Sequence, residues 1–180
     1  MAFHGCPLGC HYCLNPQSLG DSSRFREYLP LELYVETRVD ELYFLATKGG
    51  VTFGGGEPGL RPDFIREFRK ICGSGWQINL ETSLNVPAAN IEELLPVVNG
   101  LIIDIKDMNP DIYSRYTGKS NDRVLENLRL IAKARRQDDC LIRIPLIPSF
   151  NTDADRVASR SALEEYGFTH FDLFTYISVH

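Results

Sequence analysis

The chain has 180 residues, a formal net charge of −5 from 19 Lys and Arg against 24 Asp and Glu, and 43% hydrophobic residues. This composition predicts a soluble globular protein with one domain over residues 1–180, and the acidic balance argues against nucleic acid as a partner. No apolar stretch is long enough to span a membrane and the N-terminus has no signal-peptide pattern, so we expect a cytoplasmic protein without a membrane partner.

Helical and strand-like patterns alternate along the chain. The first helix begins at Pro30 and ends at Gly49-Gly50. Its apolar residues follow helical spacing; they are Leu31, Tyr34, Val35, Leu42, Tyr43 and Ala46. The later elements are a strand at 51–53, a helix at 62–72, a strand at 76–82, a short helix at 91–95, a strand at 101–105, a helix at about 121–132, a strand at 140–147, a helix at 153–166 and a strand at 168–176.

This order repeats a strand followed by a helix, and the strands read as apolar on both faces. Such strands are typical of a parallel sheet covered by helices, so the fold class is α/β. The repetition in one domain leaves two architectures open: a doubly wound sheet or a partial barrel.

The five cysteines are distributed unevenly. Cys6, Cys10 and Cys13 lie within eight residues, whereas Cys72 and Cys140 stand alone. An odd number with three clustered does not suit a secreted disulfide framework, and in a reducing compartment such a cluster indicates metal binding. We interpret Cys72 as a core residue of its helix.

Two kinds of metal site fit three cysteines in one loop. Three thiolates can hold an iron–sulfur cluster that keeps one iron open to a small molecule. The alternative is a zinc ion held by the three cysteines and either His4 or His11. Zinc loops usually pair two cysteine arms, and since no second arm is present the cluster is favoured.

Polar residues gather where the expected strands end. They are the cysteine loop, Gly54-Gly55-Gly56-Glu57, Glu81-Thr82, Asp104 with Lys106, Arg143 inside its strand, and His180 after the last strand. Because active sites of parallel α/β barrels form at that edge, we expect these residues to converge.

Asp104, Lys106 and Arg143 each allow more than one interpretation. Asp104 and Lys106 alternate on a strand and so share a face, either as part of the site or as a solvated ion pair. An unpaired buried guanidinium is costly, so Arg143 needs a partner. Glu81, Asp104 and a ligand carboxylate are the candidates.

Several motifs resemble one family. Cys6-Pro7-Leu8-Gly9-Cys10-His11-Tyr12-Cys13, followed by Asn15-Pro16, resembles the cluster loop of radical S-adenosylmethionine (SAM) enzymes. Gly49 to Pro58 is similar to the SAM-binding segment of glycyl-radical-enzyme activases, typified by pyruvate formate-lyase activating enzyme. Asp104-Ile105-Lys106 resembles their aspartate-x-lysine motif. The likeness continues in Tyr116-Thr117-Gly118, Asn121, Ile142-Arg143 and Pro148.

The resemblance implies a partial (βα)₆ TIM-like radical SAM barrel whose first strand is short or truncated, since only Met1 to Gly5 precede Cys6. It also implies one [4Fe–4S] cluster, held by the three loop cysteines, whose open iron chelates SAM. The other implied SAM contacts are Tyr12 at the adenine, Gly55, Gly56 and Glu57 at the methionyl amino group, and Asp104, Lys106 and Arg143 at the ribose and carboxylate.

The chain departs from the family pattern in two places. Glu81-Thr82 stands where the activases carry Asp-Thr, and its longer acid is expected to reach the SAM amino group or a monovalent cation that Asp104 helps to hold. Thr175-Tyr176-Ile177 stands where they carry Pro-Tyr-His, and His180 comes three positions late.

The activity implied by the resemblance is reductive cleavage of SAM to a 5′-deoxyadenosyl radical, which abstracts hydrogen from a glycine of a partner enzyme. The implied partners are a glycyl radical enzyme and an electron donor of the flavodoxin or ferredoxin type. Two alternatives stay open: a radical SAM enzyme that acts on a small molecule, and a zinc-binding or degenerate module without catalysis.

Overall fold

The computed structural model describes residues 1–20 and 25–176, so His180 and Ile177 lie outside the described residues. The strands are β1 (Ala2–Phe3), β2 (Gly50–Gly55), β3 (Gln77–Thr82), β4 (Gly100–Asp104), β5 (Cys140–Leu146) and β6 (Phe171–Thr175). The helices are α1 (Pro30–Thr37), α2 (Glu41–Thr47), α3 (Pro62–Cys72), α4 (Ala88–Leu94), α5 (Pro110–Thr117), α6 (Asp122–Lys133) and α7 (Asp153–Glu165). Among these helices, none combines the length and apolarity needed to cross a membrane.

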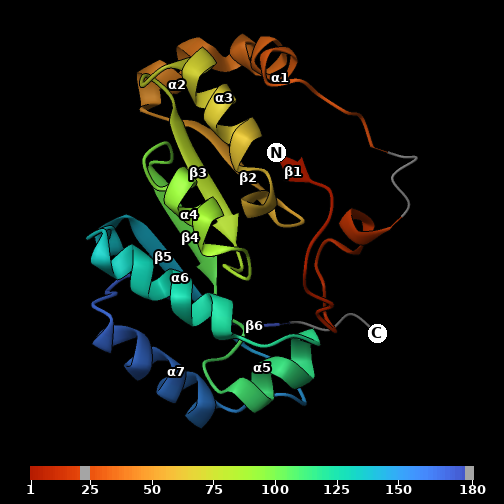
Figure 1. Ribbon diagram of the computed structural model, residues 1–180, viewed down its shortest axis with the longest axis vertical. Helices are drawn as coiled ribbons and strands as arrows, with labels where there is room; N and C mark the ends of the chain where they lie inside the picture. The colour runs from red at the N-terminus through yellow and green to blue at the C-terminus, as the bar shows by residue number, and fades with distance from the viewer. Residues whose placement is uncertain (21–24, 177–180) are drawn as a thin grey trace.

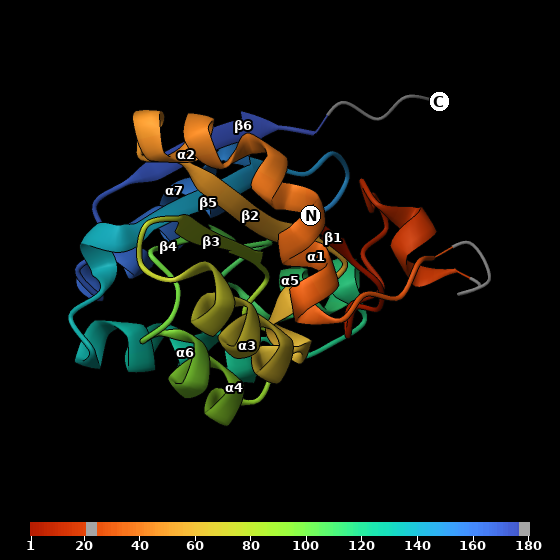
Figure 2. The ribbon, with the colours of Figure 1, turned by 90° about the horizontal axis from the view of Figure 1, so that it is seen from above.

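The strands form one parallel sheet in which the spatial order follows the chain order, β1-β2-β3-β4-β5-β6 (Figure 1). A doubly wound sheet reverses its order at a switch point, whereas an uninterrupted order is that of a barrel. Helices α3, α4 and α6 lie side by side on one face (Figure 2). The partial barrel is therefore confirmed, with a first strand of two residues as expected.

The two faces of the sheet differ in polarity. On β3, Ile78 and Leu80 are fully buried, whereas the alternating Asn79 and Glu81 are partly exposed. The expectation of strands that are apolar on both faces is wrong here, because only the helix-covered face belongs to the core. The inner face of the incomplete barrel is open and carries polar side chains.

The first helical segment also differs from expectation. Instead of one helix it contains α1, a 3₁₀ turn at Arg38–Asp40, and α2. Tyr34 and Phe44 pack against Trp76, with ring centroids 5.3 and 4.9 Å from it. Four of the residues at helical spacing are more than half exposed instead: Leu31, Val35, Leu42 and Tyr43. The 3₁₀ turn changes the helical phase, so the spacing does not define one buried face.

Helix α5 was not anticipated from the sequence. The side chain of Asn109 caps it by accepting hydrogen bonds from the amides of Asp111 and Ile112, and Pro110 fills its first position. Its last residue, Thr117, accepts a main-chain hydrogen bond from Gly9 at 2.9 Å. Helix α5 therefore supports the cysteine loop.

A glycine sets the spacing between β2 and β3. A Cβ atom on Gly50 would lie 2.0 Å from the main-chain oxygen of Gln77, its register partner. We predict that Gly50→Ala lowers the free energy of unfolding by about 3 kcal/mol, because the strands must separate. The matched control is Gly118→Asn, a left-handed position with nothing within 4 Å of a Cβ, which should cost no more than about 1 kcal/mol. Urea unfolding measures both, and equal losses would contradict the steric explanation.

Candidate functional site

A cleft opens at the carboxyl ends of the strands, with an empty volume of about 630 Å³ that includes space open to solvent. The cleft is lined by all twelve residues expected to contact the cluster or SAM: Cys6, Cys10, Tyr12, Cys13, Gly55, Gly56, Glu57, Glu81, Thr82, Asp104, Lys106 and Arg143. Gly54 does not line it, and His180 lies outside the described residues. Convergence of the strand-end residues is thus observed.

The cysteine loop is fixed to the end of β2 by main-chain hydrogen bonds. The amide of Gly56 donates to Phe3 and the amide of Glu57 donates to Gly5, each at 2.8 Å. A Cβ on Gly56 would lie 2.3 Å from the Gly5 oxygen, and Gly55 has a φ of +91°. Gly56 is therefore required by the close approach of the N-terminal segment, and Gly55 both by that approach and by its left-handed backbone.

The three loop thiols are half-buried. Burial raises the pKa of the Cys6 thiol to about 11 and also raises the pKa of Cys10, although the charge of Lys106 opposes the second shift. Metal coordination requires thiolates, so a bound metal or cluster must compensate this cost.

A single zinc ion is poorly served by the described residues. No three of their His, Cys, Asp and Glu side chains converge closely enough to hold one metal ion. Neither candidate histidine lines the cleft: Nε2 of His4 lies 3.0 Å from the Gly20 oxygen, and the ring of His11 lies against Phe150. The zinc alternative therefore lacks a fourth ligand here, whereas a larger cluster needs thiols that line one wall, as these do.

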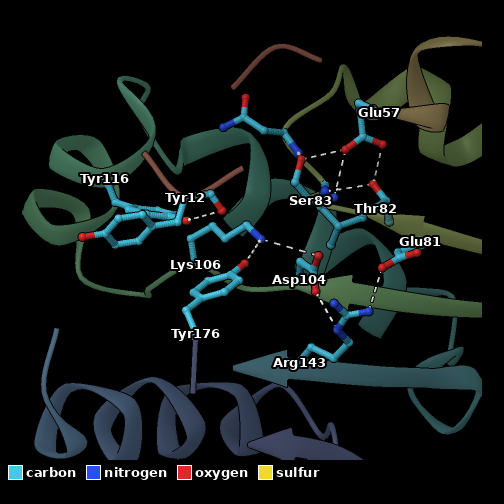
Figure 3. Close-up of polar contacts among 12 residues, drawn as sticks. Tyr12, Glu57, Glu81, Thr82, Ser83, Asp104, Lys106, Tyr116, Arg143 and Tyr176 are labelled. Atoms are coloured by element: carbon cyan, nitrogen blue, oxygen red, sulfur yellow. Dashed lines mark hydrogen bonds and ion pairs between the residues drawn. The ribbon is translucent and has the colours of Figure 1, made fainter. Parts of the chain in front are cut away.

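Glu57 is buried, and its carboxylate is fully occupied by the protein. Oε1 accepts hydrogen bonds from the hydroxyl of Thr82 at 2.7 Å and the amide of Gly59 at 3.0 Å. Oε2 accepts from the hydroxyl and amide of Ser83 at 2.6 and 2.9 Å (Figure 3). Burial raises the pKa of Glu57, and these four donors oppose the shift because they favour the ionised form. Glu57 thus ties the glycine loop to the end of β3.

A second network joins the ends of β3, β4, β5 and the residue after β6. Arg143 pairs with Glu81 at 2.7 Å and with Asp104 at 2.9 Å, so among the described residues both candidate partners are used. Lys106 lies 3.5 Å from the other oxygen of Asp104 and donates a hydrogen bond to the hydroxyl of Tyr176 at 3.1 Å (Figure 3). Asp104 and Lys106 are mostly buried, which excludes a solvated ion pair.

One acceptor in this network remains incompletely used. Oδ1 of Asp104 is buried and accepts no well-aligned hydrogen bond from the described residues, because the nearby Nε–H of Arg143 does not point at it. A buried carboxylate oxygen without such a donor favours a ligand that brings a hydroxyl or amino group.

Aromatic side chains form the wall next to the cysteine loop. Tyr116 is fully buried and packs against Phe150 and Tyr12, with centroid distances of 5.0 and 6.3 Å. Its hydroxyl donates to the main-chain oxygen of Tyr12 at 3.4 Å, which fixes the loop. Tyr12 itself lines the cleft.

Five lining residues were not predicted for the site: Leu8, Leu14, Asn15, Ser83 and Tyr176. The last two belong to the polar networks. Ser83 donates to Glu57, and Tyr176 pairs with Lys106. Their positions directly after Thr82 and after β6 offered a signal, since residues that follow a barrel strand reach this edge.

A family model described as the radical SAM superfamily matches residues 2–159. The chain is 40% identical over 129 residues to the (2S)-3-sulfopropanediol dehydratase activating enzyme of Klebsiella oxytoca, which covers 71% of this chain and 40% of that protein. It is 32% identical over 158 residues to the pyruvate formate-lyase-activating enzyme of Staphylococcus aureus, which covers 84% of this chain and 62% of that protein. The chain thus spans about half the length of these relatives.

Among solved structures, SuiB of Streptococcus suis bound to S-adenosylmethionine aligns with a TM-score of 0.70 at 14% identity. The alignment covers 98% of this chain and 40% of that one. This likeness shows the fold, which is shared by a chain of very different sequence.

The occupied state of Glu57 leads to a prediction about stability. Glu57→Gln replaces an acceptor oxygen by an NH₂ group that faces two donors, so we expect a loss of about 2 kcal/mol in the free energy of unfolding. The matched control is Glu67→Gln, whose exposed pair with Lys70 on α3 is worth less than about 1 kcal/mol. Urea unfolding measures the free energy of unfolding of both variants. An unchanged value for Glu57→Gln would contradict the prediction and show that the carboxylate is free for a ligand.

Proposed function

Since the chain belongs to the radical SAM superfamily, we propose that it cleaves SAM reductively and activates a glycyl radical enzyme. The superfamily implies a [4Fe–4S] cluster and SAM. The observation that carries the proposal is that the three cysteines and the aspartate-x-lysine pair, far apart in sequence, line one open cleft. The relatives named above are activating enzymes, which supports the choice of reaction.

The donor set fits the cluster. We assign Cys6, Cys10 and Cys13 as its ligands, because three thiols line one wall of the cleft and no histidine of the described residues lines it with them. Lys106 stabilises negative charge at Cys10. When bound, the cluster supplies the electron that splits SAM into methionine and a 5′-deoxyadenosyl radical.

The remaining lining residues fit SAM. The buried oxygen of Asp104 lacks an aligned donor, which a ribose hydroxyl can supply, and Lys106 carries the charge that a carboxylate needs. Tyr12 offers a flat surface for the adenine. Because the carboxylate of Glu57 is occupied, we assign the methionyl amino group to the main chain of residues 55–57.

An open cleft suits a protein substrate, because a glycine-bearing loop of a partner must reach the bound SAM. We propose a flavodoxin or ferredoxin-type electron donor and a cytoplasmic location, in keeping with cysteines that are all free. One domain over residues 1–180 remains a prediction. For the expected monovalent cation, the described residues offer a poor fit, because Arg143 already pairs with Glu81 and Asp104.

The first test measures cluster chemistry. After anaerobic reconstitution, the protein with SAM and dithionite should yield equal amounts of 5′-deoxyadenosine and methionine. Cys10→Ala should lose the iron and sulfide and at least about a hundredfold of this cleavage, because a ligand is removed. Cys72→Ala, half-buried and outside the cleft, should keep both. Bound zinc without iron or sulfide in the unsubstituted protein would contradict the proposal.

The second test identifies the substrate class. We expect a persistent glycyl radical by electron paramagnetic resonance when the reconstituted chain is mixed with SAM, reductant and one of two probes: pyruvate formate-lyase or (2S)-3-sulfopropanediol dehydratase. A probe whose radical-bearing glycine is replaced by alanine serves as control and should give no signal. Deoxyadenosine formed alongside a modified small molecule, with no radical in either probe, would favour the alternative of a small-molecule substrate.

A further inference from the structure

Arg143 reaches across the sheet to bind two carboxylates from two other strands. It lies on β5 in register with Asp104 of β4, and Glu81 comes from β3, one strand further away. Nη1 lies 2.7 Å from Glu81 and Nε lies 2.9 Å from Asp104, so the guanidinium lies between the two acids (Figure 3). The family resemblance implies that Glu81 reaches either the SAM amino group or a monovalent cation, and that Asp104 helps to hold that cation.

The charges around this position are already balanced. Glu81 and Asp104 carry two negative charges, and Arg143 and Lys106 carry two positive charges. Burial lowers the pKa of Arg143, but Asp104 and Glu81 raise it by more, so the guanidinium stays charged. The hydroxyl of the neighbouring Thr82 is also in use, because it donates to Glu57 and accepts from the amide of Leu84.

An alkali cation does not fit this arrangement. Oxygen ligands from Glu81 and Asp104 would bring the ion next to the guanidinium, and like charges that share a partly buried site repel strongly. To bind such an ion, the protein would have to break both ion pairs of Arg143. The residues present therefore disagree with the cation that the resemblance implies.

We propose that the guanidinium of Arg143 supplies the positive charge that a monovalent cation would bring to this position, so that this chain binds SAM without Na⁺ or K⁺. Arg143 is then a positioning residue. It holds Glu81 and turns Asp104 so that its second oxygen faces Lys106. The inference rests on the proposed function in one respect, the binding of SAM at this cleft.

The proposal predicts that removal of Arg143 creates a cation requirement. Arg143→Gln leaves Glu81 and Asp104 close together without a counter-charge. A small cation can then bind between them. We test K⁺, Na⁺ and free guanidinium, the last at a few millimolar. A merely structural arginine would give a variant whose defect is not repaired by any of these ions.

The experiment measures the dissociation constant of SAM for the reconstituted full chain in choline chloride, NaCl and KCl at equal ionic strength. The dissociation constant of SAM for the unsubstituted protein should vary by less than about twofold among the salts, as expected for a site that binds no cation. Arg143→Gln should lose about tenfold or more of its affinity in choline chloride and regain most of it with KCl or guanidinium. Arg160→Gln, an exposed arginine on α7, is the matched control and should follow the unsubstituted protein.

A second readout does not depend on SAM. The unfolding temperature of Arg143→Gln without SAM should rise when KCl replaces choline chloride, and that of the unsubstituted chain should not. If no variant binds SAM in any salt, the proposed function fails while this comparison still tests the role of Arg143. Arg143→Lys, which keeps the charge, should remain independent of the salt and serves if Arg143→Gln does not fold. The proposal would be overturned if the SAM affinity or unfolding temperature of the unsubstituted protein depended on K⁺, or if neither quantity changed with cations in Arg143→Gln.

Discussion

The position of the cysteine loop depends on the missing side chains of Gly55 and Gly56. Because glycine has no side chain, the main chain of Phe3 and Gly5 comes close enough to accept hydrogen bonds from the end of β2. A Cβ atom on Gly56 would collide with Gly5. This contact adds to the pairing of β1 with β2, which spans two residues. Three thiols on an otherwise irregular loop are thereby held over the open face of the barrel.

A second constraint acts across the sheet, where side chains from neighbouring strands form hydrogen bonds and ion pairs with one another. Glu57 joins the loop after β2 to the end of β3, and Arg143 joins β3, β4 and β5. Lys106 extends the chain of contacts to Tyr176 after β6. In a parallel sheet without a covering layer on its inner face, such contacts replace apolar packing and also fix the geometry of the cleft before any ligand binds.

The sequence predicts most of the fold and all the lining residues that carry a motif, because strand patterns and motif spacing are local properties. Two features were not predicted. Leu42 follows helical spacing yet is exposed, because the 3₁₀ turn after α1 changes which face meets Trp76. Helix α5 was missed although Asn109-Pro110 is a typical helix start, because its apolar residues are few and scattered.

The chemical type of a residue does not tell whether its binding capacity is already used. Glu57 and Thr82 were predicted to contact a ligand, yet their oxygens are occupied within the protein. The loop thiols form no disulfide, and one oxygen of Asp104 accepts no well-aligned hydrogen bond from the described residues, so a ligand gains most from binding there. Occupied groups set the shape of the cleft and the unused groups set what it binds. Arg143 belongs to the first class, and for that reason its charge is a fixed part of the site.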